Sequence, residues 1–315
     1  MSTDAAHRGI VSKISEGICA CEYQNVYQDW LLAAAYSNED FPNGIADRKY
    51  LDIDGLFGDR PVAVQGSAAH SMLLNTEALR RAGYDIENEP DTHGAKFFRR
   101  PDGSLTGELA EAAMTKAALA IPKPNLAHVR RTLKHAIRLA HKAGVTSMQE
   151  ASANTQLLHA LSEMEMLGSL NLDINAHIVY DCEWLASEPK DSLDQLLDAA
   201  EQYYSKHVDT RFVKIMLDGV PLPPLFTHAG IDEHGHVDQS KIATQDVVDA
   251  VLKFDQLGRT VKIHCTGHGS TRLALDAIEA ARKVNPHGPR HEIAHNSGVH
   301  EGTRQQFSSF RGNEC

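Results

Sequence analysis

The chain has 315 residues, of which 42% are hydrophobic and 23% are charged, values that are typical of a folded globular protein. A formal net charge of -11 repels phosphate backbones, so the composition argues against nucleic acid as a partner. No run of about 18 apolar residues is present and residues 1–9 are polar, so we expect no membrane contact. The five cysteines form no C-x-x-C pair, which favours a reducing, cytoplasmic location.

The first 122 residues show little regular pattern, and we divide them into a segment of unclear fold at 1–60 and a second segment at 61–122. Hydrophobic spacing and turn-forming residues predict four features within them. These are a helix near Asn25–Ala35, a strand at Pro61–Gln65, a helix at Asn75–Ala82, and a hairpin within Glu87–Gly107 that turns at Pro101-Asp102-Gly103.

Strands and helices alternate strictly over residues 123–315, which indicates parallel strands joined by right-handed crossovers. The predicted strands are Val145–Gln149, Leu172–Val179, Phe212–Leu217, Thr260–His264 and Glu292–His295. The predicted helices are Ala127–Lys142, Thr155–Leu167, Ser192–His207, Thr244–Leu257, Thr271–Val284 and Glu301–Phe310. An open doubly wound sheet and a closed α/β barrel both fit this pattern. No G-x-G-x-x-G motif or P-loop follows a strand, so nucleotide binding has no support.

Polar residues stand at the ends of the predicted strands, where α/β barrels carry their chemistry. They are Glu150, Asp181, Lys214 with Asp218, His264 and His295. Lys214 lies between Val and Ile on a strand that should be buried, and burial disfavours its charged form. The residue therefore needs either an ion pair, with Asp218 or Glu150, or a modification. Carbamylation by carbon dioxide would make it an anionic metal ligand.

Histidine is unusually frequent, with 18 residues in the chain. A single histidine at a strand end is more often only hydrogen-bonded, but His264 and His295 end successive strands after the buried lysine. Because imidazole is the commonest ligand of zinc-like metals, this arrangement favours a metal site. The one H-x-H string, His234-Gly235-His236, lies in a long polar loop, and we interpret it as a solvated hairpin tip.

Several motifs in order along the chain resemble amidohydrolase family 3 of the metal-dependent amidohydrolase superfamily, and within it the N-substituted formamide deformylases. The likeness covers roughly residues 25–310. Besides the strands with Lys214, His264 and His295, the matching pieces are Pro61–Val64, Gly66–Ser71, Asn75–Leu79, Asp102–Leu109 and Ala143–Ser147.

The resemblance implies a (β/α)8 TIM barrel and hydrolysis of a carbon–nitrogen, non-peptide bond in a small amide or formamide-like substrate. In that family a divalent metal, often zinc, is held by an H-x-H pair on strand 1, a carbamylated lysine on strand 4, histidines on strands 5 and 6, and an aspartate on strand 8. With Val145–Gln149 as strand 2, Lys214, His264 and His295 fall on strands 4, 5 and 6. Residues 61–122 become an insertion after strand 1. The implied substrate-binding residues are His70, Glu150, Asp218 and His268.

The chain also departs from the family pattern. No H-x-H pair precedes residue 60, no counterpart of the strand 8 aspartate is recognisable, and His268 stands where the family usually has an acidic residue. We therefore expect an incomplete barrel, with strands 2–6 legible, impaired activity, and self-association through open sheet edges. The alternative is a catalytically inactive amidohydrolase-like fragment or pseudoenzyme. A phosphotriesterase-like barrel is disfavoured by the motifs at His70 and at Asp102–Leu109.

Overall fold

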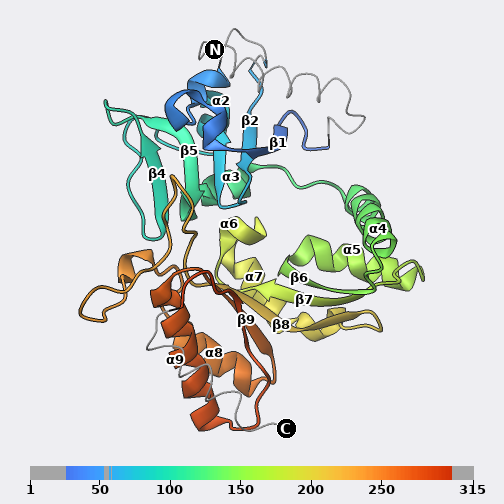
Figure 1. The fold of residues 1–315 in the computed structure, drawn as a ribbon. Coiled ribbons are helices and arrows are strands. Elements are labelled where there is room, and N and C mark those ends of the chain that lie inside the picture. Colours follow the sequence, from blue (N-terminus) through green and yellow to red (C-terminus); the bar gives the residue numbers. More distant parts are fainter. Residues whose placement is uncertain (1–25, 53–56, 58, 300–315) are drawn as a thin grey trace. The chain divides into compact units, whose positions relative to one another are not determined.

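The computed structural model describes residues 26–52, 57 and 59–299 of a chain that divides into two compact units (Figure 1). Unit 1 comprises residues 1–125 together with 223–225, and unit 2 comprises residues 126–222 and 226–315. In the described part of the chain, no helix is long and apolar enough to cross a membrane.

Unit 1 is built on a five-stranded mixed sheet in the order β1-β2-β3-β5-β4. Strands β1 and β2 are parallel, and the other neighbouring pairs are antiparallel. The strands are β1 (Leu31–Tyr36), β2 (Val62–Gly66), β3 (Ser71–Leu74), β4 (Ala95–Arg99) and β5 (Leu105–Glu111). Two short helices, α2 (Thr76–Arg81) and α3 (Thr115–Ala120), complete the unit with 3-10 turns at Asn38–Asp40, Pro42–Gly44, Arg48–Tyr50 and Ala112–Met114.

The helix predicted near Asn25–Ala35 is wrong, because Leu31–Tyr36 forms strand β1. Its Leu-Leu-Ala-Ala-Ala sequence favours a helix locally, but pairing with β2 overrides this weak preference. The strand predicted at Pro61–Gln65 is present as β2, so strands from residues 1–60 and 61–122 share one sheet. The hairpin is confirmed as β4–β5, and Gly103 adopts the φ of +91° that its turn requires.

Unit 2 contains a five-stranded, wholly parallel sheet in the order β10-β9-β8-β7-β6. Its strands are β6 (Ser147–Ala153), β7 (Asp173–Val179), β8 (Val208–Met216), β9 (Thr260–Cys265) and β10 (Glu292–His295). Its helices are α4 (Leu126–Lys142), α5 (Thr155–Met166), α6 (Glu183–Ala186), α7 (Lys190–Asp198), α8 (Val247–Gln256) and α9 (His268–Val284), with 3-10 turns at Ala200–Tyr203 and Gln239–Lys241. The predicted alternation of strands and helices is confirmed from α4 to β10, over the described part of residues 123–315.

The strand order decides between the two architectures left open by the sequence. Each described strand lies beside its predecessor, without the reversal that defines a doubly wound sheet. The sheet is also strongly curved, because the Gln149 amide on β6 donates to the Glu292 carboxylate on β10 at 3.1 Å. In a flat sheet four strand spacings would separate these strands by about 19 Å. The five strands therefore form an arc of the barrel type.

Several helix boundaries in unit 2 differ from the prediction; α8, for example, begins at Val247, three residues after the predicted Thr244. The helix predicted over Ser192–His207 ends at Asp198, and β8 begins at Val208 rather than Phe212. Helix α9 begins at His268, three residues before the predicted start. The helix predicted at Glu301–Phe310 lies outside the described residues.

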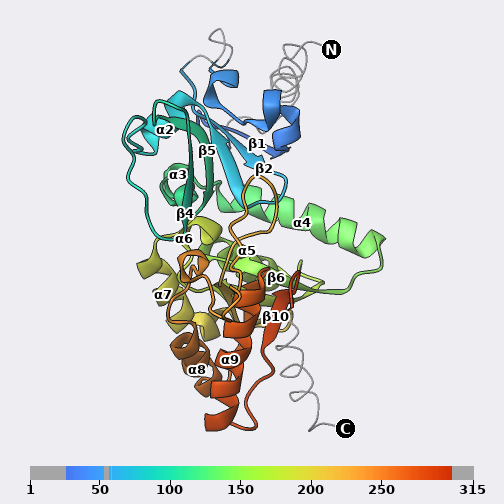
Figure 2. The same cartoon turned by 60° about the vertical axis from the view of Figure 1, so that its left-hand side comes forward.

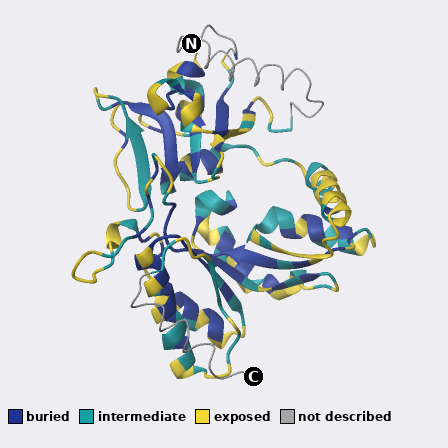
Figure 3. Ribbon diagram, viewed as in Figure 1, coloured by how far each residue is buried: buried dark blue, intermediate teal, exposed yellow. Residues whose placement is uncertain are grey.

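Burial is uneven across unit 2 (Figure 3). Val213, Ile215, Val261 and Ile263 on the central strands are fully buried in the core. Side chains alternate along a strand, so Lys214 and His264 point to the opposite face of the sheet. Helix α4 (Figure 2), by contrast, buries only Ile137 among its residues.

Candidate metal centre

Strand β8 places Lys214 in the interior of the sheet because β7 and β9 cover it on both sides. The side chain is only 4% exposed. Burial lowers the pKa of Lys214 to about 8, and the nearby positive charge of Lys262 lowers it further in the same direction. Near physiological pH the neutral amine is therefore much more populated than it would be for an exposed lysine.

The ion pair considered for Lys214 is not formed with either carboxylate. Glu150 Oε1 accepts hydrogen bonds from the backbone N–H and the hydroxyl of Ser152, at 2.9 and 3.0 Å. Asp218 is occupied by other donors. Among the described residues, no carboxylate forms an ion pair with Lys214. The cost of burying its ammonium charge is therefore not offset by an opposite charge.

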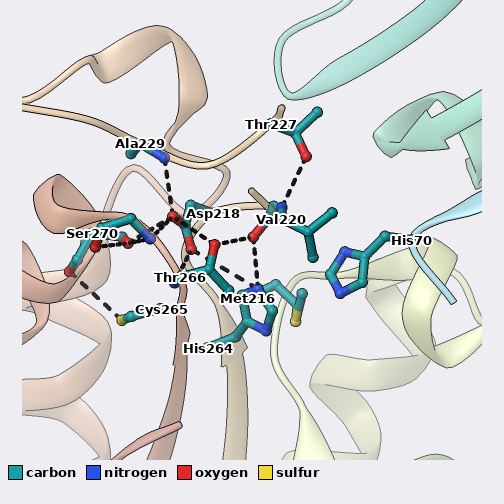
Figure 4. A network of polar contacts seen from close by, with 12 residues as sticks. His70, Met216, Asp218, Val220, Thr227, Ala229, His264, Cys265, Thr266 and Ser270 are labelled. Atoms are coloured by element: carbon teal, nitrogen blue, oxygen red, sulfur yellow. Dashed lines mark hydrogen bonds and ion pairs between the residues drawn. The ribbon is translucent and has the colours of Figure 1, made fainter. Parts of the chain in front are cut away.

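Asp218, which is 2% exposed, is the centre of a dense set of hydrogen bonds (Figure 4). Its Oδ1 accepts from the Thr266 N–H at 3.0 Å. Its Oδ2 accepts from the N–H groups of Ala229 and Gly267, at 3.0 and 2.9 Å, and from the Ser270 hydroxyl at 2.7 Å. We call these five residues the Asp218 network. It joins the end of β8, the following loop and the N-terminus of α9.

His264 lies at the end of β9 and is 3% exposed. Its Nε2 lies 3.0 Å from the Gly219 carbonyl oxygen and 3.9 Å from Asp218 Oδ1. A carbonyl oxygen can only accept a hydrogen bond, so Nε2 carries the proton and the lone pair of the neutral ring is on Nδ1. Metal-binding histidines usually donate their other N–H to a carbonyl or carboxylate in this way.

His295 ends β10, and its ring stands edge-on to that of His264 with 4.6 Å between the ring centroids. It adopts a φ of +75°, in the left-handed region, and is exposed. The structure therefore brings together the two predicted histidine ligands. Lys214 lies on the neighbouring strand, two residues before Met216, which is paired with His264.

The donor set fits a metal in part. Two adjacent imidazoles and a buried amine with a lowered pKa are suitable ligands, the amine after carbamylation. Within the described ranges, however, no three His, Cys, Asp or Glu side chains gather as a group that could hold a metal ion. Cys182 and Cys265 are both free thiols, and burial raises the pKa of Cys265 well above its ordinary value.

The remaining candidate residues are distributed over both units. His268 is the first residue of α9 and is exposed, three residues after the end of β9. Glu150 lies on β6, which is at the opposite end of the strand order from β10. His70 belongs to unit 1, where its Nδ1 lies 3.0 Å from a Glu111 carboxylate oxygen.

Sequence reasoning missed Glu111 and the partners of Asp218. Glu111 is 6% exposed and has a φ of +55°, a costly conformation for a residue with a side chain. It follows the Asp102–Leu109 motif by two residues, so the motif could have been extended to it. The spacing of Gly267 and Ser270, a helix start with a hydroxyl three residues later, could likewise have shown where α9 begins.

The H-x-H string is confirmed as a solvated turn. The side chains of His234 and His236 are 72% and 78% exposed. Their backbone N–H groups donate to Asp232 Oδ1 at 2.9 and 2.8 Å, between the bridged residues Ile231 and Val237. This string therefore does not contribute to the strand-end site.

Comparison with known proteins identifies relatives along nearly the whole chain. The family model described as "Amidohydrolase family" matches residues 2–314. The "Exoenzymes regulatory protein AepA" of Pectobacterium carotovorum is 23% identical over 83% of this chain and 56% of its own length. The "Putative amidohydrolase YtcJ" of Bacillus subtilis is 24% identical over 86% of this chain and 50% of its own length. The chain thus spans about half the length of these curated relatives.

Solved structures give the same picture of the fold. An uncharacterised metal-dependent hydrolase from Pyrococcus horikoshii superposes with a TM-score of 0.63 at 17% identity, covering 96% of this chain and 55% of that one. A second such hydrolase, from Pyrococcus furiosus, has a TM-score of 0.59 at 17% identity, covering 96% of this chain and 57% of that one. At this identity the likeness concerns the fold alone, whereas the family match rests on the sequence. The chain belongs to the amidohydrolase family.

Proposed function

We propose that this protein is a metal-dependent hydrolase that acts on a carbon–nitrogen, non-peptide bond of a small amide or formamide-like substrate. A divalent metal, zinc in our proposal, would be held by His264, His295 and a carbamylated Lys214. When bound, such a metal supplies Lewis-acid activation of water and of the scissile carbonyl. The family match and the metal-dependent hydrolase neighbours support the general class.

The observation that carries this proposal is the state of Lys214. A buried lysine that pairs with no carboxylate in the described part of the chain is costly as a cation, and its lowered pKa of about 8 makes the neutral amine available. The neutral amine can add carbon dioxide, forming an N–C bond and releasing one proton, to give a carbamate anion. Beside two imidazoles, that anion would complete a three-ligand set.

Substrate contacts are proposed for residues that border the strand ends or carry the family motifs. His268 lies at the start of α9, directly after the strand that carries His264. Glu150 and His70 retain the substrate-binding roles implied by the resemblance, and Glu111 would fix the ring orientation of His70 through its 3.0 Å contact with Nδ1. The role of Asp218 is treated below.

The second candidate is an amidohydrolase-like chain without catalytic activity. The absence of a three-member ligand group in the described part of the chain favours it. Asp218 is engaged by four donors and is poorly placed to move a proton, a contribution commonly worth about 10²–10⁴-fold in rate. We therefore expect weak turnover from this chain at most.

A turnover screen separates the two candidates. The chain is incubated with zinc and with panels of N-formyl and N-acyl amines, and compared with His295→Ala and with the control His234→Ala, which alters only the solvated turn. Zinc-dependent turnover that His295→Ala removes and His234→Ala keeps would support the hydrolase. Turnover equal in all three proteins would be a contaminant, and its absence in a folded, zinc-loaded chain would favour the inactive candidate.

A further inference from the structure

The Gly219 carbonyl is the group that fixes the tautomer of His264. It accepts from His264 Nε2 at 3.0 Å and from the Thr266 hydroxyl at 2.5 Å. Any displacement of this carbonyl would remove the reason for the proton to stay on Nε2. The question is therefore what holds the peptide that follows Asp218.

The backbone on either side of this carbonyl is held by hydrogen bonds. The Gly219 N–H donates to the Thr227 carbonyl at 3.2 Å, and the Val220 N–H donates to the Thr227 hydroxyl at 2.9 Å. On the preceding side, the Leu217 N–H donates to the His264 carbonyl at 3.3 Å. Between these points, the Asp218 side chain anchors the peptide to the N-terminus of α9.

Asp218 has little capacity left for a substrate. A carboxylate offers about four lone-pair sites, and four groups of the Asp218 network donate to it at 2.7–3.0 Å. Three of these are N–H groups or hydroxyls at the start of α9 or just before it, where negative charge is favoured by the helix dipole. The fourth, from Ala229, ties the loop that follows β8.

The loop and the helix are in direct backbone contact at this point. A Cβ on Gly267 would lie 2.0 Å from the Ala229 carbonyl oxygen, and one on Gly269 would lie 2.5 Å from that of Gly230. Glycine is thus required at both positions for the loop to reach Asp218. Because Gly267 and Gly269 have no side chains, the loop after β8 can approach the start of α9 closely enough for the Asp218 network to form.

We infer that Asp218 is a positioning residue. Through the Gly219 carbonyl, it holds His264 in the tautomer with the proton on Nε2 and the lone pair on Nδ1. The inference rests on the proposed function only in that this lone pair would serve a metal. It replaces the role of substrate contact that the resemblance implied for Asp218. The network itself concerns only residues of unit 2.

The test measures the tautomer of His264 in the full chain without metal. Histidine labelled with ¹⁵N gives two-bond couplings that distinguish Nε2–H from Nδ1–H, observed at a pH where the rings are neutral and assigned with His264→Gln. Asp218→Asn is compared with Asp238→Asn as a matched control, because exposed Asp238 also accepts from a serine hydroxyl and an N–H two residues on, at 2.6 and 3.1 Å. Thermal melts verify folding.

The wild-type chain and Asp238→Asn should show His264 as the Nε2–H tautomer. In Asp218→Asn the ratio of Nε2–H to Nδ1–H should fall by about two- to tenfold, the range that one net hydrogen bond contributes. A folded Asp218→Asn variant with an unchanged ratio would overturn the inference. If that variant does not fold, Ser270→Ala decides, since it removes one donor to Asp218. A lowered ratio there supports the inference and an unchanged one overturns it.

A zinc titration of the same proteins keeps this inference separate from the proposed function. Loss of an outer hydrogen-bond partner of a metal ligand commonly weakens metal affinity by about 10–100-fold, and we expect this for Asp218→Asn. If the tautomer responds to the variant but the wild-type chain binds no zinc, the positioning role stands and the metal proposal fails.

Discussion

Polar side chains on the central strands of the parallel sheet differ in burial and in hydrogen-bond partners from those on its edge strand β6. On central strands β8 and β9, Lys214 and His264 are almost fully buried, and His264 is hydrogen-bonded to the loop that follows β8. On β6, which pairs only with β7 among the described strands, Ser147 to Gln149 are exposed and Glu150 is bonded to its own neighbour Ser152. A neighbouring strand on both sides thus accounts for the burial of Lys214 and His264, which the residues of edge strand β6 lack.

The largest expected effect is on the free energy of unfolding, and it comes from a buried carboxylate on helix α8. Asp255, 2% exposed on α8, accepts from Arg282 and from His291 Nε2, the latter at 2.9 Å. Asp255→Asn should lower the free energy of unfolding by about 3–5 kcal/mol, because removing one partner leaves buried donors uncompensated.

An exposed ion pair on α9, also in unit 2, provides the control for Asp255→Asn. Glu279 pairs with Lys283 on α9, but these side chains are 41% and 72% exposed. Glu279→Gln should change the denaturation midpoint by no more than the error of the measurement, since exposed pairs contribute little. Equal losses from both substitutions in urea unfolding would contradict the distinction between buried and exposed charges.

The next effect concerns pH. His177 on β7 is fully buried against Phe212, and its Nε2 has no hydrogen-bond partner among the described residues. Burial lowers the pKa of His177 to about 4; the charge of Lys262 lowers this pKa as well, whereas that of Glu292 raises it. The unfolded state binds the proton more readily, so stability should be lost as pH falls from about 6.5 toward 4, by about 3 kcal/mol in total.

His177→Leu removes this titration and keeps an apolar contact with Phe212. Urea unfolding at several pH values should therefore show a flatter pH dependence for the variant than for the wild type over that window. Parallel curves for the two proteins would show that His177 is not the source of the acid sensitivity. The exposed His236 gives a control substitution, His236→Gln, that should leave the curve unchanged.

The smallest effect on stability is expected at the edge. Met148 on β6 is 41% exposed, so Met148→Lys should leave the thermal midpoint nearly unchanged. A lysine on an open edge opposes pairing with another chain. If self-association occurs through β6, size-exclusion chromatography should show less of it for the variant, and identical concentration dependence would place the association elsewhere.

The sequence predicted unit 2 better than unit 1 for a physical reason. Buried parallel strands between amphipathic helices have strong local patterns, and β10 has the predicted bounds Glu292–His295. Strand β1 was missed because it is defined by pairing with β2, in which Leu31 lies opposite Val62, 31 residues further along the chain.

The same limit applies to the candidate site. Lys214, His264 and His295 were predicted from strand ends and family resemblance, and the structure places the two histidines in contact. The Asp218 network could not be read from the sequence, because its donors lie 11 to 52 residues further along the chain. Local spacing carries no information about which of these distant groups meet.

The central claim, that Lys214, His264 and His295 hold a metal, is tested most directly by zinc binding measured by calorimetry with elemental analysis. The wild-type chain, with bicarbonate present, should bind at most one zinc, and weakly. His264→Ala and Lys214→Met should abolish this binding, and His234→Ala should retain it. Binding that survives both site substitutions, or that is lost in His234→Ala, would contradict the assignment, as would two tightly held zinc ions per chain.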